Sequence, residues 1–170
     1  MYLGKMAIRI KMVTKTNNKL EKAIQTLKSG YVKIGWFEGQ KEPNGLLVSE
    51  NAYMQNNGFT IKHKNGKQTY VPPRPFMQIT MTNNANKWNN FWKQHYKEVV
   101  DGKINLKQAL NRLGIMVKSD IQDTIISSNG IRPNAPSTIE SKRRKGSPLI
   151  PLIDSSTMLS SINYKSEEQK

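Results

Sequence analysis

Residues 59–76, FTIKHKNGKQTYVPPRPF, join a predicted β-hairpin to the start of a predicted long helix. The pair Asn65-Gly66, flanked by runs that favour strands, predicts a hairpin with a two-residue type I′ turn. The hairpin faces are mostly polar, so we expect it to project from the body of the protein. Residues 71–76 predict a rigid extended connector, because proline fixes φ and lacks an N–H. Pro75 is also tolerated in the first turn of the helix that follows.

Two long helices are predicted after this connector. Large apolar side chains recur at three- and four-residue steps until Asp101-Gly102, namely Trp88, Phe91, Trp92, Tyr96 and Val99. This spacing favours a face that packs in the core. The lysines beside these aromatic residues leave a platform for stacking bases as an alternative. Asn105 is the expected cap of the second helix. Its apolar stripe is Leu106, Leu110, Leu113, Val117, Ile121 and Ile125, and the helix is expected to stop at Asn129-Gly130.

Shorter elements complete the predicted fold. Alternating apolar residues predict strands over residues 6–13 and 31–37, with a helix between them that places Leu20, Ile24 and Leu27 on its core face. We also expect short helices over 46–56 and 137–145, a turn capped by Asp154 or Ser155, and a last strand over 162–165. The expected fold class is α+β: a small antiparallel sheet with a projecting β-hairpin, packed against two long helices. Residues 1–165 form one domain in this scheme, and residues 166–170 form a mobile tail.

The chain is strongly basic. Its 170 residues include 27 Lys and Arg against 12 Asp and Glu, for a net charge of +15. Such a balance attracts polyanions, nucleic acid above all. The densest cluster is Lys142-Arg143-Arg144-Lys145, and residues 51–97 carry seven basic residues and no acid. A compositional drift toward Lys and Asn is the other explanation, and the sequence leaves both open.

Several classes of site lack sequence support. There is no cysteine, which excludes disulfides and thiolate metal sites. His63 and His95 have no acidic or histidine neighbour at ligand spacing. Asp120 and Asp123 lie three residues apart and could hold Mg²⁺ or act as acid and base, but a solvated helix face explains them more simply. No phosphate-binding glycine motif, signal peptide or membrane-spanning stretch is evident. We therefore predict no enzyme activity, no metal and no cofactor.

Four segments, in this order, resemble the motifs of one protein family. They are residues 32–38 (VKIGWFE), 51–59 (NAYMQNNGF), 71–77 (VPPRPFM) and 134–139 (NAPSTI), the last followed by Lys142 and by residues 148–156 (PLIPLIDSS). The family is that of tailed-bacteriophage neck proteins, also called head–tail joining, tail-completion, minor tail or virion-morphogenesis proteins. This chain departs from the family pattern at Gln55, near a position that is often acidic, and at Ser155-Ser156, where Thr-Gly is usual.

The resemblance implies a structural virion protein that forms an oligomeric ring at the neck and joins the head connector to the tail. Its implied partners are further copies of itself and the head connector, stopper or tail-terminator proteins of the same phage, with transient contact to genomic DNA and none to a membrane. The implied location is the virion, after assembly in the host cytoplasm. A basic nucleic-acid-binding protein, free in the cytoplasm, is the alternative.

Two groups of residues are the candidate contact sites. The subunit-interface candidates are Arg74, Phe76, Lys62, Lys64 and Lys67. The candidates for a basic surface or DNA channel are Lys142, Arg143, Arg144 and Lys145. Arg74 is singled out because its backbone is preset by prolines and its planar fork can pair with a carboxylate of a neighbouring subunit. A plain connector role for the same segment stays open.

Overall fold

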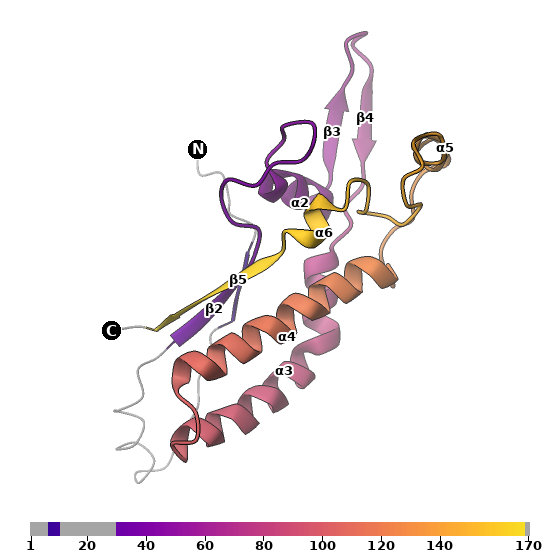
Figure 1. Ribbon diagram of the computed structural model, residues 1–170. Helices are drawn as coiled ribbons and strands as arrows, with labels where there is room; N and C mark the ends of the chain where they lie inside the picture. The colour runs from indigo at the N-terminus through magenta and orange to yellow at the C-terminus, as the bar shows by residue number, and fades with distance from the viewer. Residues whose placement is uncertain (1–6, 11–29, 169–170) are drawn as a thin grey trace.

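A three-stranded antiparallel sheet packs against a pair of long helices (Figure 1). The computed structural model describes residues 7–10 and 30–168. The sheet has the order β1 (Ala7–Ile10), β2 (Gly30–Gly35) and β5 (Asn163–Glu168), and the helices are α3 (Phe76–Val100) and α4 (Leu106–Ser127). This arrangement confirms the predicted α+β class. The helix expected between the first two strands lies outside the described residues.

Strands β2 and β5 both pack against α4. Val32 and Ile34 alternate on the face that packs against α4, and both are fully buried. The partner strand β5 is longer than predicted, because residues 166–168 continue the ladder opposite residues 30–32. The expectation that residues 166–170 form a mobile tail is therefore wrong for 166–168. Backbone pairing needs no apolar side chains, and Lys33 Nζ adds an ion pair to Glu167 Oε1 at 3.2 Å.

The long helices follow their sequence signals closely. Asn105 and Gln108 form a reciprocal capping box at the start of α4, with N–O distances of 2.9 and 2.8 Å. The apolar stripe of α4 is buried from Leu110 to Ile125. On α3, Trp88 and Trp92 are buried in the same core, which confirms the core interpretation of the aromatic residues. Their indole rings are thus not available for stacking bases.

Helix α4 lies close to the sheet at Gly114. A Cβ atom at this position would lie 2.4 Å from Cδ2 and 2.6 Å from Cγ of Tyr164, on β5. Because real side-chain contacts to carbon begin near 3.5 Å, only a glycine lets the helix backbone rest on the Tyr164 ring at this spacing. Gly114 therefore sets the distance between α4 and the sheet.

The hairpin β3 (Phe59–Lys62) and β4 (Gln68–Val71) stands away from the body, as predicted (Figure 1). Its turn differs from the prediction. His63 N donates to Lys67 O at 2.8 Å and Gly66 N donates to His63 O at 3.0 Å, so three residues lie in the loop. Only Gly66 has positive φ there, at 80°. This is a three-residue loop with a glycine bulge and not a type I′ turn, which would require positive φ at Asn65 as well.

Short helices surround the base of the hairpin. They are α2 (Val48–Asn57), α5 (Pro136–Lys145) and the single turn α6 (Thr157–Ser160). The residue at the N-cap of α6 is Ser156 and not the predicted Asp154 or Ser155, although Ser155 Oγ accepts a hydrogen bond from Thr157 N at 3.2 Å. None of the described helices has an apolar stretch long enough to cross a membrane.

Candidate functional site

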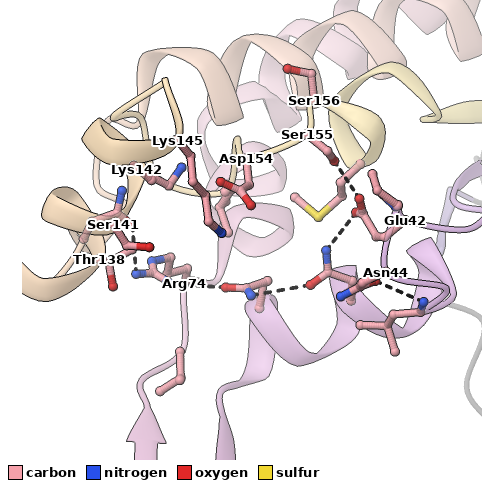
Figure 2. A pocket seen from close by; sticks show the side chains of 18 of the residues that line it. Glu42, Asn44, Arg74, Thr138, Ser141, Lys142, Lys145, Asp154, Ser155 and Ser156 are labelled. Carbon is pink, nitrogen blue, oxygen red and sulfur yellow. Dashed lines mark hydrogen bonds between the residues drawn. The ribbon is translucent and has the colours of Figure 1, made fainter. Parts of the chain in front are cut away.

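A cleft of about 510 Å³ opens at the base of the hairpin, between α5 and the loop that precedes α2 (Figure 2). Five charged side chains line it: Glu42, Arg74, Lys142, Lys145 and Asp154. Its apolar lining is Pro43, Leu46, Phe59, Val71, Leu152 and Met158. Most of these residues belong to, or adjoin, the segments that carry the family resemblance. The cleft is therefore the place where those distant segments meet.

Arg74 connects the segments that line the cleft. Its Nη1 donates to Gln55 Oε1 at 3.0 Å, its Nε donates to Arg132 O at 3.1 Å, and its Nη2 lies 3.4 Å from Asn134 Oδ1. The backbone joins in, since Arg74 N donates to Gln55 O at 2.9 Å. The side chain thus ties the hairpin base to α2 and to the segment that leads into α5.

These bonds correct the prediction for Arg74. Its side chain is only 9% exposed, and three of its five N–H groups go to acceptors of its own chain. It therefore acts first as an internal brace and not as a free fork for a neighbouring subunit. Burial lowers the pKa of Arg74, and the nearby charge of Arg132 lowers it further.

Phe76, predicted at a subunit interface, lies in the core of this chain. Its side chain has no exposed surface, and its ring meets Trp36 edge-to-face with centroids 5.8 Å apart. Trp36 in turn donates from Nε1 to Met158 O at 2.7 Å. The first and third of the resembling segments are thus locked together in the core.

Lys142 also departs from the prediction. It is 7% exposed, and its ammonium donates to three backbone carbonyls, those of Pro148 at 2.9 Å, Ile150 at 3.1 Å and Ile153. It pins the loop 146–153 onto α5 and does not contribute to an open basic surface. Burial lowers the pKa of Lys142, although the charge of Asp154 acts in the opposite direction.

The other residues of this basic run face solvent. Arg143, Arg144 and Lys145 are exposed, and Arg144 makes a loose ion pair to Glu140, with Nε and Oε1 3.5 Å apart. Lys145 extends into the cleft beside Asp154 (Figure 2). Their role as a basic surface stays a prediction.

The hairpin presents the remaining candidates. Lys62, Lys64 and Lys67 are exposed, with no acidic residue between positions 59 and 71. Two large apolar side chains accompany them: Ile61 is 40% exposed on one face and Tyr70 is 65% exposed on the other. This surface is available for contact, and its role at a subunit interface stays a prediction.

The carboxylate pair on α4 does not form a common site. Asp120 is buried and accepts hydrogen bonds from Trp88 Nε1 at 2.6 Å and Lys87 Nζ at 2.5 Å, whereas Asp123 is exposed. The prediction that both lie on a solvated face is therefore wrong for Asp120, which is a structural anchor between α3 and α4. Within residues 7–10 and 30–168, no group of three or more His, Asp or Glu side chains is arranged to hold a metal ion.

Sequence reasoning missed the acceptors of Arg74. Arg132 and Asn134 lie 58 and 60 positions away along the chain, and no local pattern links them to Arg74. The only available signal was that Gln55 and Asn134 occur in segments that resemble the same family. Comparison of the chain with models of protein families, with curated proteins and with solved structures gives no match.

Proposed function

We propose that this chain is a structural, non-catalytic protein of a tailed-bacteriophage virion, which forms an oligomeric ring at the neck and joins the head connector to the tail. The observation that carries the proposal is the hairpin β3–β4. It projects from the body, residues 60–70 are all exposed, and within the described residues each of its strands pairs only with the other.

An isolated two-stranded hairpin is marginally stable in water. Both of its outer edges offer unpaired N–H and C=O groups, on which another chain can build by strand addition. Ile61 and Tyr70 supply apolar contact on its two faces. A hairpin of this kind gains stability when a neighbouring subunit covers it, and repeated head-to-tail contacts of one kind close into a ring.

The base of the hairpin is built to hold it at a defined angle. The connector 72–75 is rich in proline and lies outside regular secondary structure, and Arg74 fastens it to α2 and to the chain before α5. A preset orientation reduces the conformational entropy that is lost on docking. This supports the idea that the segments resembling the neck-protein family serve as a mount for an assembly arm.

The charge of the chain suits the proposed location. Lys62, Lys64 and Lys67 on the hairpin, together with the exposed basic side chains of α5, give a positive surface that tolerates the passage of genomic DNA or meets acidic partner rings. The same lysines also favour the second candidate function, a free nucleic-acid-binding protein.

Quantitative mass spectrometry of purified virions tests the proposal directly. In particles of the phage whose genome encodes this chain, we expect a small and fixed copy number, comparable to that of other neck proteins. Absence of the chain from intact particles would overturn the proposal.

A shortened hairpin tests the role of the arm. Replacing residues 62–68 by Asn-Gly joins Ile61 to Thr69, which lie opposite each other in the register. Because the removed residues are all exposed, the free energy of unfolding should change by less than about 0.5 kcal/mol. Ring assembly and head–tail joining should be lost. A matched variant with Lys62, Lys64 and Lys67 changed to Gln keeps the strands, so assembly through backbone pairing should persist, and a weakened assembly would assign these lysines to the subunit interface.

The rival function gives a different result with the same variants. A free nucleic-acid-binding protein should retard DNA as a monomer, with affinity that falls steeply as salt rises. The triple Gln variant should then lose binding as fully as the shortened hairpin. Loss of assembly in the shortened hairpin alone favours the ring.

A further inference from the structure

Two buried cations, Arg74 and Lys142, line the cleft, and in the part of the chain that the structure describes only Lys142 is influenced by a nearby acid, Asp154. Arg74 and Lys142 are both more than nine-tenths buried, and their hydrogen bonds go to carbonyl and amide oxygens only. Within the described residues, no carboxylate forms an ion pair with either. Neutral oxygens accept from the ammonium of Lys142 and from three N–H groups of Arg74, but they do not offset the positive charges, and Asp154 acts on Lys142 alone.

Uncompensated charge in a partly dry environment is costly, because the surrounding medium screens it poorly. Arg74 still has two N–H groups without a protein acceptor among the described residues. The remaining cation of the cleft, Lys145, is exposed and reaches into the same space (Figure 2). An anionic group in the cleft would therefore lie near the guanidinium of Arg74 and the ammonium of Lys145, whereas the ammonium of Lys142 is engaged by three backbone carbonyls.

The two acids of the lining play unequal parts. Glu42 has both oxygens engaged, Oε1 with Asn51 Nδ2 at 2.9 Å and Oε2 with Ser155 Oγ at 2.7 Å. Asp154 is exposed, and its negative charge repels an anion that enters the cleft beside it. The charges of the lining therefore favour a ligand with one negative charge near Lys145 over a ligand with several adjacent negative charges.

We propose that this cleft binds a carboxylate side chain presented by an extended peptide segment of a partner protein, with apolar residues on either side of the acid. The carboxylate lies between Arg74 and Lys145. The flanking apolar side chains lie against Phe59, Val71 and Leu152, which line the same cleft.

The lining favours such a peptide over nucleic acid. A phosphate backbone brings one charge per nucleotide, and Glu42 and Asp154 would repel the neighbouring phosphates. Apolar lining gives a phosphodiester nothing to contact, whereas it suits the side chains beside an acid. The inference stands apart from the ring proposal, because it concerns the cleft and not the edges of the hairpin.

Titration of the ¹⁵N-labelled full chain at low salt tests the proposal, with acetyl-Phe-Glu-Phe-amide as the probe. The peptide should shift the backbone amide signals of Thr138, Ser141 and Ser155, which line the cleft. Acetyl-Phe-Gln-Phe-amide, which lacks only the charge, should bind clearly more weakly. Equal binding of the two peptides would overturn the proposal, and so would shifts confined to residues outside the cleft.

Three single substitutions test which charged residues affect the affinity for the peptide. Lys145→Gln should weaken binding about two- to fivefold, and Asp154→Asn should strengthen it by a similar factor. Arg143→Gln removes the same charge from the same helix, but Arg143 does not line the cleft, so binding should stay unchanged. An equal loss in Arg143→Gln and Lys145→Gln would indicate general attraction to a basic surface and overturn the site. Cleft shifts caused by a short oligothymidylate, with none from the Glu peptide, would overturn it in favour of nucleic acid.

Discussion

The contact between Gly114 and Tyr164 gives a sharp test of how α4 rests on the sheet. In Gly114→Ala, the new methyl group would lie 2.4, 2.6 and 2.9 Å from three carbons of the Tyr164 ring. Ordinary contact needs about 3.5 Å or more, so helix and ring must separate by about 1 Å. Overpacking of this kind costs about 1–3 kcal/mol.

Helix propensity works against this cost. Alanine is better than glycine in a helix interior by about 1 kcal/mol. Because the required shift is large, we place the overpacking cost near the top of its range. The net loss in the free energy of unfolding should be about 1–2 kcal/mol. For a chain of this length that corresponds to a fall in Tm of about 2–8 °C.

Urea unfolding followed by circular dichroism measures the loss. Ser119→Ala, on the exposed face of the same helix, is the matched control and should be neutral or slightly stabilising. In a Tyr164→Ala background the ring is absent, so Gly114→Ala should cost less than in the wild type and the two changes should be non-additive. A Gly114→Ala variant more stable than the wild type would refute the close approach of α4 to the sheet.

Two further predictions concern buried charged groups. Asp120→Ala removes the acceptor of Trp88 Nε1 and should lower the free energy of unfolding, measured in urea, by about 1–3 kcal/mol. Asp123 is exposed, so Asp123→Ala should have little effect. Equal effects of the two substitutions would contradict the anchoring role of Asp120. Burial lowers the pKa of Lys142 in the folded chain below its ordinary value of 10.5. Between the folded-state pKa and the ordinary pKa of the unfolded chain, the unfolded chain binds more protons than the folded chain. The contribution of Lys142 to stability should therefore rise as pH increases toward 10.5, and the slope of unfolding free energy against pH should be more positive in the wild type than in Lys142→Met.

The segments on which the predicted family resemblance rests contact one another. Arg74 bonds to Gln55 and lies within reach of Asn134, and Phe76 packs on Trp36. Their side chains are engaged in bracing the chain, so the resemblance concerns the mount of the hairpin more than an exposed contact surface. The hairpin, the lining residue Lys145 and the solvent side of α5 remain exposed.

The position of Lys142 illustrates how charge counting can mislead. In the sequence it belongs to a run of four basic residues, and the helical repeat turns its neighbours away from it. The fold then buries Lys142 under the loop 146–153, while Arg143 and Arg144 stay in solvent. Lys142, one of the four basic residues in this run, therefore has a structural role.

Local signals determined much of this fold. The capping box at Asn105, the apolar stripe of α4 and the proline connector act through residues close in the chain, so the sequence alone located the long helices and the hairpin before them. The hairpin loop shows the limit of such signals. Asn65-Gly66 suits more than one turn, and the observed loop takes three residues with only Gly66 at positive φ.

The tertiary structure decided what each polar side chain does. Arg74, Lys142 and Asp120 look exposed or ambiguous in the sequence, yet each is buried against groups that the packing of distant elements brings to it. The partners of Arg74 on the α5 side lie 58 and 60 positions away, and Trp88 lies 32 positions from Asp120. Periodicity reports which face of one helix or strand is apolar. Which face meets which depends on the approach of elements such as α4 and β5 at Gly114, and that approach exists only once the chain is folded.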